Sequence, residues 1–237
     1  VLDGNEVPVI SPYFEGYEDL GEPKRLSENQ ERFFNGSNIF GEGFYLEPQE
    51  AETLLNEDER YKDIVFQVMN GKELTSSPLQ VPSRHIINFF DWSEEKSAKY
   101  TSAFKLIEQR MKPEREKIPR DTPINRHYHD HWWQYGVLVR SLYDRLQLSE
   151  WCFVIAAPSK YLALSRMPTN IVFTHALRVF PFDEWHLFSI LQSTLHEVWA
   201  RKYCGSLETR LRYSPSNCFN NFPFPADLWQ TANSTLA

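Results

Sequence analysis

Three alternating histidines form the densest chemical cluster in this sequence. His127, His129 and His131 lie in the segment RHYHDHWWQYG, with Asp130 between the last two. Alternate residues of a β-strand share one face, and three imidazoles on one face can bind a transition metal. A distant fourth ligand is missing, so we favour the alternative in which the aromatic residues at 132–135 anchor the core and the histidines cover its rim. We therefore predict no metal site here, although the metal-enzyme alternative stays open.

Two further sets of residues resemble catalytic motifs. Asp91, Glu94 and Lys96 have the residue types of a metal-dependent nuclease, but they would share one first helical turn, whereas such carboxylates converge from separate strands. Gly41 and Gly43 resemble a phosphate-binding loop but lack the third glycine and the helix directly behind it. We predict a helix cap and a tight turn at these places, and no catalytic residue in this chain.

Basic side chains gather after the helix predicted from Asp91 to Pro113. Three prolines interrupt this stretch, so we predict an extended backbone whose side chains form a ridge suited to phosphates. The alternative is a solvated loop paired with the acids at 114, 116 and 121. The basic residues are Lys112, Arg115, Lys117, Arg120 and Arg126.

Four apolar segments after Glu150 predict a meander of strands. They are WCFVIAAPS, KYLALSRMP, IVFTH and LRVFPF. Alternation in the second segment places polar side chains on one face. Long polar side chains on a short twisted sheet suit the edges of nucleic-acid bases, and they suit a wet surface equally.

Residues 186–225 should frame this meander. Their first part predicts one helix that ends near Gly205, with a polar edge and a single buried stripe. The aromatic and proline run at 219–225 is too apolar for a free tail and must be covered. The predicted stripe is Leu187, Ile190, Leu191, Leu195, Val198 and Trp199, and the predicted polar edge holds Gln192, His196, Arg201 and Lys202.

Composition sets the broad class. The chain has 237 residues, of which 41% are hydrophobic and 15% aromatic, so it can bury a large core. It has no membrane-spanning run or signal peptide, and three cysteines suit reduced thiols. We expect a cytoplasmic protein without a membrane partner. Because the chain starts at Val1 without a Met, we also expect it to begin inside a longer protein.

The net charge of −7 conceals an asymmetry. Residues 1–100 hold 20 acidic and 9 basic residues, whereas residues 101–237 hold 12 acidic and 16 basic ones, a net +4. The second part is therefore the candidate for binding a polyanion. Random segregation of surface charge is the alternative explanation.

These patterns predict an α+β fold. We expect mixed or antiparallel sheets with several packed helices in a single large recognition domain at 36–225. Residues 1–35 should form an irregular connector, because they are rich in Pro, Gly and acids. Residues 226–237 should form a C-terminal tail.

Several separated blocks, in this order, resemble one known family. They are NIFGEGFYLEPQEAETLL, SRHIINFFDW, MKPER, HWWQYG and LQSTLHEVWARKYCGSLETRLRYSPSNCFNNFPFP. From about residue 28 to 225 the chain is similar to the target recognition region of MmeI-like type IIL restriction-modification enzymes and related class I adenine methyltransferases. The tryptophan pair, the long helix, the LRY turn and the FPFP ending carry this resemblance.

The resemblance implies a chain that positions duplex DNA for a methyltransferase domain preceding it in the same polypeptide of a prokaryotic cell. That domain would use S-adenosylmethionine to methylate a flipped adenine at N6. Because this chain has no Asn-Pro-Pro-aromatic motif, the chemistry would lie outside it, with no cofactor in this chain. Whether the parent protein also carries a nuclease stays open.

On this reading the residues that contact DNA form two sets. The predicted phosphate contacts are Lys112, Arg115, Arg120, Arg126, Arg201 and Arg212. The segment from Lys160 to Arg178 would enter a groove, and the predicted base-reading residues are Lys160, Tyr161, Ser165, Arg166 and Arg178. The competing function is a protein–protein interaction module or inter-domain scaffold that does not touch DNA.

Overall fold

The computed structural model describes residues 1–10, 16, 21, 23–207, 210–225 and 227–229. Their contacts divide into two compact units. Unit 1 comprises Val1–Gln30, Pro158–Leu162 and Glu184–Ala237, and unit 2 comprises Glu31–Ala157 and Ala163–Asp183. The domain boundaries expected at residues 35 and 225 stay a prediction.

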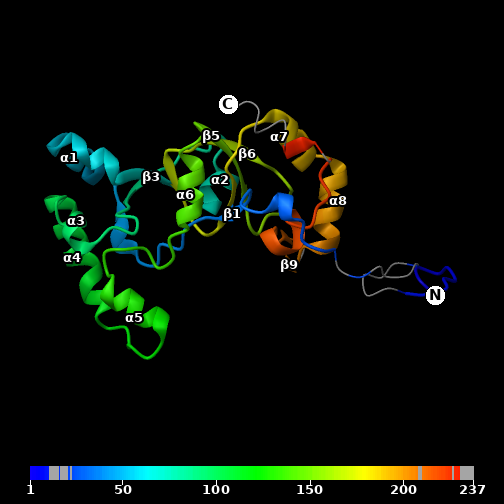
Figure 1. Ribbon diagram of the computed structural model, residues 1–237, viewed down its shortest axis with the longest axis horizontal. Coiled ribbons are helices and arrows are strands. Elements are labelled where there is room, and N and C mark those ends of the chain that lie inside the picture. Colours follow the sequence, from blue (N-terminus) through cyan, green and yellow to red (C-terminus); the bar gives the residue numbers. More distant parts are fainter. Residues whose placement is uncertain (11–15, 17–20, 22, 208–209, 226, 230–237) are drawn as a thin grey trace. The chain divides into compact units, whose positions relative to one another are not determined.

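Unit 2 contains two four-stranded sheets (Figure 1). One has the antiparallel order β1 (Phe34–Asn35), β8 (Leu177–Phe180), β5 (Trp151–Ala156) and β6 (Ser165–Pro168). The other has the order β2 (Tyr45–Leu46), β4 (Arg84–Ile87), β3 (Val65–Met69) and β7 (Ile171–Phe173), of which β3 and β7 are parallel. The predicted α+β class, with antiparallel and mixed sheets, is confirmed.

The predicted meander is wrong at β7. Strands β6 and β8 pair with β5, but β7 crosses to the other sheet, where Val172 pairs with Val68 of β3. β7 is the last strand of that sheet, yet all three of its residues are buried, as is typical of parallel strands covered on both faces. The predicted strand KYLALSRMP starts only at Ser165, because Leu162 is buried in unit 1, where its carbonyl accepts a hydrogen bond from Gln192.

A short segment around Gly36 connects the two sheets. Phe34 pairs with β8, and the Gly36 N–H donates to Leu177 O at 3.1 Å. One residue later, the Ser37 N–H donates to Phe173 O at 2.9 Å, at the end of β7. A Cβ on Gly36 would lie 2.6 Å from Phe173 O and closer still to Thr174 O. Only glycine permits this approach.

Helices cover the sheets of unit 2. The buried residues Ala51, Leu54, Ala103, Ile107 and Met111 pack in one core with β3 and β4, as their helical spacing predicts. The α-helices are α1 (Pro48–Glu57), α2 (Gly71–Ser76), α3 (Glu94–Ser97), α4 (Thr101–Arg115), α5 (Pro123–Asp130) and α6 (Arg140–Leu146). Short 3₁₀ turns are η1 (Ser27–Asn29) in unit 1, and η2 (Glu42–Phe44) and η3 (Glu59–Asp63) in unit 2.

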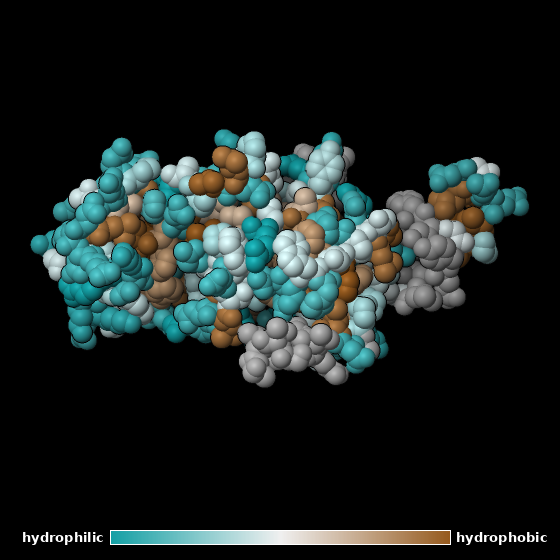
Figure 2. All heavy atoms as spheres, turned by 90° about the horizontal axis from the view of Figure 1, so that it is seen from above, coloured by the Kyte–Doolittle hydropathy of each residue, from teal (hydrophilic) through white to brown (hydrophobic). Residues whose placement is uncertain are grey.

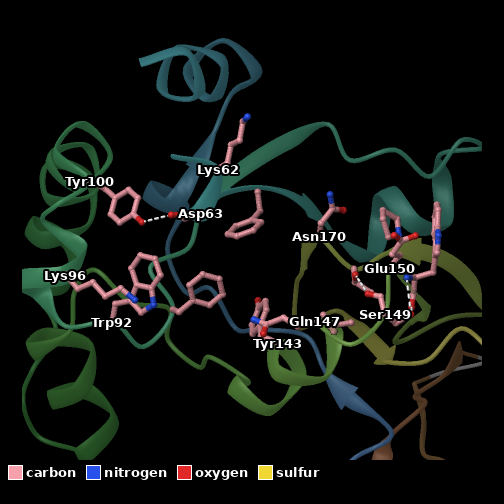
Figure 3. Close-up of a pocket in the computed structure, with 16 residues that line it drawn as sticks. Lys62, Asp63, Trp92, Lys96, Tyr100, Tyr143, Gln147, Ser149, Glu150 and Asn170 are labelled. Atoms are coloured by element: carbon pink, nitrogen blue, oxygen red, sulfur yellow. Dashed lines mark hydrogen bonds between the residues drawn. The ribbon is translucent and has the colours of Figure 1, made fainter. Parts of the chain in front are cut away.

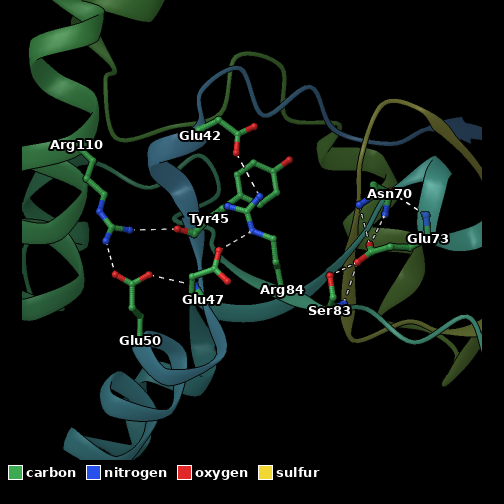
Figure 4. A network of polar contacts seen from close by, with 9 residues as sticks. All are labelled: Glu42, Tyr45, Glu47, Glu50, Asn70, Glu73, Ser83, Arg84 and Arg110. Carbon is green, nitrogen blue, oxygen red and sulfur yellow. Dashed lines mark hydrogen bonds and ion pairs between the residues drawn. The ribbon is translucent and has the colours of Figure 1, made fainter. Parts of the chain in front are cut away.

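A network of ion pairs holds the edge strand β2 between α1 and β4 (Figure 4). Arg84 of β4 lies 4.4 Å from the centre of the Tyr45 ring and 3.3 Å from a carboxylate oxygen of both Glu42 and Glu47. Arg110 of α4 donates to Tyr45 O at 3.2 Å and pairs with Glu50. These contacts reach both the backbone and the ring of β2, so they fix a strand of only two residues.

Unit 1 is built from α7 (Trp185–Leu191), α8 (Thr194–Tyr203), β9 (Ser206–Leu207), β10 (Arg210–Leu211) and a single π-helical turn, η4 (Pro215–Phe219). The single helix predicted at 186–205 is therefore wrong. Ser193 interrupts it by capping α8, since its hydroxyl accepts from the His196 N–H. The break changes the helical phase, so Leu195 and Val198 are 73% and 61% exposed, whereas His196 and Ala200 are buried.

The aromatic run at 219–225 is covered, as predicted. The Phe222 ring lies 4.4 Å from the His196 ring, and the Phe224 ring lies 4.9 Å from that of Trp229. The buried Asn29 joins the layers, because its amide donates to Phe222 O and its carbonyl oxygen accepts from the Trp229 indole. Trp229 thus belongs to the core and not to a free tail.

The rest of the predicted tail, at 226 and 230–237, lies outside the described residues, as do 11–15, 17–20 and 22 of the predicted connector.

We predict that Gly36→Ala destabilises the chain, because the new methyl group would overlap two backbone oxygens. Overpacking of this kind costs about 1–3 kcal/mol or more. Gly205→Ala is the matched control, since a Cβ there meets no atom within 4 Å. Urea unfolding of both variants tests the prediction, and equal stability of the two would contradict it.

The buried His196 should make unit 1 sensitive to acid. Burial lowers its pKa to about 4, below its ordinary value of about 6.5. Below pH 6.5 the imidazole is protonated in the unfolded chain but stays neutral in the folded chain. The free energy of unfolding therefore decreases as the pH falls from 6.5, by about 3 kcal/mol near pH 4. Urea unfolding of His196→Gln should show a weaker pH dependence, and exposed His186→Gln should match the unsubstituted chain. Unchanged pH dependence in His196→Gln would refute the assignment.

Candidate nucleic-acid interface

The face of the molecule drawn in Figure 2 is predominantly polar. On this face, hydrophilic side chains surround small, separate apolar patches. Among the described helices, none combines the length and the apolar content needed to cross a bilayer.

Arg115 is a correction to the predicted phosphate contacts. Helix α4 continues through Pro113 and ends at Arg115, whose side chain is buried, whereas we expected it on an extended ridge. Its guanidinium lies about 5 Å from the rings of Phe40 and Tyr128 and donates to Phe40 O at 2.8 Å. Burial lowers the pKa of Arg115 to about 10, so it stays charged at neutral pH. It anchors α4 from inside and presents nothing to a phosphate.

The other predicted phosphate contacts in unit 2 lie at the surface. Lys112 pairs with Glu108 at 2.9 Å along α4 and lies over the Trp132 ring. Arg120 pairs with Asp130 at 2.7 Å, and the exposed Arg126 donates to Arg120 O at 3.3 Å. Together with the exposed Lys117, Arg120 and Arg126 form what we call the α5 basic surface.

The histidine cluster adopts a helix and not the strand that a shared face requires. His127 and His131 stack at 4.6 Å between ring centres, one helical turn apart. His129 points elsewhere, with its Nδ1 2.7 Å from the Arg120 guanidinium. Burial lowers the pKa of His127. Within the described part of the chain, no cluster of three potential ligands is placed to hold a metal.

The two other sets of residues that resemble catalytic motifs have structural roles. Ser93, and not the predicted Asp91, caps α3, because Asp91 pairs with Arg140 instead. Gly41 caps η2 with a φ of 138°, and a Cβ on Gly43 would lie 2.6 Å from the Met111 sulfur. These glycines let α4 pack closely and do not cradle a phosphate.

In unit 1 the fold brings together four of the residues predicted to contact DNA, which are Lys160, Tyr161, Arg201 and Arg212. Ser159 and Leu211 exchange two backbone hydrogen bonds of 3.1 and 2.8 Å, which places Lys160 opposite Arg210. Residues on either side of the buried Leu211 point away from the core, and both Arg210 and Arg212 are exposed.

Helix α8 adds Arg201 to this group. Its guanidinium donates to Lys160 O at 3.4 Å and pairs with Glu197 at 2.6 Å. Tyr161, which is 62% exposed, lies beside the Lys160 ammonium, 5.2 Å from the ring centre. The Lys160 cluster consists of Lys160, Tyr161, Arg201, Arg210 and Arg212.

The remaining predicted base-reading residues belong to unit 2 and already have protein partners. Ser165 accepts a hydrogen bond from Gln80 at 2.8 Å. Arg166 pairs with Asp183 at 3.0 Å and lies over the Trp151 ring. Arg178 donates to the carbonyls of His175 and Leu177. The structure thus divides the predicted set between the two units, with only Lys160 and Tyr161 in unit 1.

Unit 2 also contains a cleft of about 910 Å³ that the sequence did not indicate (Figure 3). Its lining comes from four separate stretches, at 62–66, 90–100, 143–151 and 168–170. Because these stretches meet only in the folded chain, no local spacing could reveal them.

A family comparison covers nearly all of this architecture. The model of the MmeI target recognition domain matches residues 22–226, which include both basic surfaces and the cleft. The chain belongs to this family. The resemblance seen in the separated sequence blocks is thereby confirmed.

Two individual relatives agree with this assignment. A solved structure described as the type IIL restriction-modification enzyme MmeI in complex with DNA has a TM-score of 0.67 and 17% sequence identity, over 97% of this chain and 30% of its own. DNA methyltransferase A of Bacillus subtilis (strain 168) is 31% identical over 65 residues, which are 27% of this chain and 7% of that protein. This target recognition domain therefore spans less than a third of either relative.

Proposed function

We propose that this chain recognises a specific sequence in duplex DNA and positions the duplex for base flipping and adenine-N6 methylation by a catalytic domain elsewhere in the same polypeptide. The observation that carries the proposal is the family match at 22–226, which spans both units. The solved relative supports it, because that enzyme is described in complex with DNA. Residues 36–225 would then act as one recognition domain assembled from both units, in a prokaryotic cytoplasm.

Phosphate contacts in this proposal come from two surfaces. The α5 basic surface and Lys112 supply one, and Arg201 and Arg212 supply the other. Three of these cations, Lys112, Arg120 and Arg201, already form surface ion pairs, which are worth only about 0–1 kcal/mol each. A phosphate can replace such a carboxylate partner with little loss, and release of counterions favours the exchange.

Base reading in this proposal falls first to Lys160 and Tyr161. Both are exposed, and a lysine can donate to the acceptor edge of guanine in the major groove. Arg166, Ser165 and Arg178 remain proposed readers, but each must first exchange the partner that it has in this structure. Arg166 would exchange Asp183 and Ser165 would exchange Gln80.

S-adenosylmethionine would supply the methyl group in the catalytic domain. Within the described residues, the one glycine pair that resembles a nucleotide loop, Gly41 and Gly43, is filled by Met111. The contribution of this chain is to select and hold the duplex.

One observation favours the competing function of a protein-binding module. Leu195 and Val198 are exposed on one face of α8, a small apolar strip that another domain of the same polypeptide could cover. Association through such a strip would not weaken with salt, whereas binding to DNA would.

Duplex binding by the chain should weaken steeply as salt increases. We expect Arg126→Ala to reduce the slope of log affinity against log salt by about 1, as for one lost phosphate contact. Lys72→Ala, an exposed cation on α2, is the matched control and should leave the slope unchanged. Fluorescence anisotropy at four salt concentrations measures this, and salt-independent binding would overturn the proposal in favour of the protein-binding module.

Sequence preference should respond differently at two neighbouring positions of the Lys160 cluster. Lys160→Ala should relax preference at one base pair by about 10-fold, since a good base contact contributes about 1–3 kcal/mol of discrimination. Arg201→Ala should weaken binding to all sequences alike. Selection from a random duplex library by each variant distinguishes these effects, and an unchanged selected sequence with both Lys160→Ala and Arg166→Ala would exclude these residues as base readers.

A further inference from the structure

The cleft of unit 2 has aromatic walls (Figure 3). Trp92 stacks on Tyr100 with 5.6 Å between ring centres and 29° between ring planes. Phe90 meets the rings of Phe66 and Tyr143 edge-on, at 5.8 and 5.5 Å. Each of these rings is held by another ring and remains partly exposed, so the walls are rigid and offer π-surface to a ligand.

Two side-chain amides also line this cleft. Asn170 lies where the chain crosses from β6 to β7, and Gln147 follows α6. Both residues are exposed, and neither amide has a hydrogen-bond partner among the described residues. Each offers a donor and an acceptor together, which is the pattern that pairs with the edge of adenine.

Charged groups at the cleft are balanced. Lys62 pairs with Glu59 at 3.1 Å, and Lys96 lies 3.5 Å above the centre of the Trp92 ring. Asp63 accepts from the Tyr100 hydroxyl at 2.9 Å, and Glu150 lines the opposite side. Two cations and two anions give no net charge, which favours a ligand whose bound face is neutral.

We propose that this cleft binds one unstacked nucleobase, with its edge bonded to Asn170 and Gln147. The base would stack against Phe90 and take the place of the exposed Lys96 ammonium over the Trp92 ring. A volume of about 910 Å³ is within the range of small-molecule sites. An apolar peptide side chain would cover the two amides without forming hydrogen bonds to them, which costs free energy. A planar base can stack on the aromatic rings and form hydrogen bonds with the amides. The binding of a nucleobase follows from the residues that line the cleft. Only duplex DNA as the source of that base rests on the proposed function.

The first arm of the test uses AMP and ribose 5-phosphate with the 237-residue chain. AMP should quench tryptophan fluorescence saturably, with a dissociation constant on the order of 1 mM, and ribose 5-phosphate should not. Asn170→Ala and Trp92→Ala should each weaken AMP binding, the latter by about 10-fold through lost stacking. Trp185→Ala, an exposed tryptophan of unit 1, is the control and should bind AMP normally.

The second arm compares a fully paired duplex with one that carries a single unpaired adenosine. If DNA supplies the base, the chain should prefer the bulged duplex by about 10-fold, and Asn170→Ala should remove most of that preference. Equal affinity for the two duplexes, combined with AMP binding, would identify a free nucleotide as the source.

Absence of both AMP binding and bulge preference would overturn the nucleobase site. The proposed recognition function would then still stand if both duplexes bound with a steep salt dependence. Asn170→Ala keeps the test valid even if Trp92→Ala fails to fold, because the Asn170 side chain is exposed and makes no hydrogen bond among the described residues.

Discussion

The close approach of Gly36 to the backbone oxygens of Phe173 and Thr174 is the contact on which the larger unit depends. Within four residues the chain pairs with β8 of one sheet and then with the end of β7 in the other. Any Cβ would separate these strands by steric overlap. Both sheets are thus joined through backbone hydrogen bonds at one place.

The same crossing arranges the groups available for binding. Because β7 leaves the sheet of β5 and β6 to pair with β3, Asn170 comes to line a cleft together with Phe66 of β3. The chain before β6 is divided in a comparable way. Lys160 joins β10 and α8 in unit 1, while Arg166, six residues later, pairs with Asp183 in unit 2.

Burial separates the arginines into two roles. Arg115 holds α4 against Phe40 and Tyr128 from the interior, where a lost partner would be costly. Arg120 and Arg201 hold exposed carboxylates, and such pairs exchange readily with other anions. Arginines that look alike in the sequence therefore have different roles. A buried guanidinium lies in a low dielectric and holds the fold, whereas an exposed one lies in water and is available to an anion.

By itself, the sequence determined the α+β class, the inward faces of α1 and α4, and the family to which the chain belongs, since apolar spacing and separated motifs are local properties. It also predicted that the run at 219–225 must be covered. Only the tertiary structure decided that Ser193 breaks the last long helix, that Arg115 is buried and that β7 joins the other sheet. It alone assembled the aromatic cleft. Each of these outcomes depends on contacts between residues far apart in the chain, and local propensity cannot register such contacts.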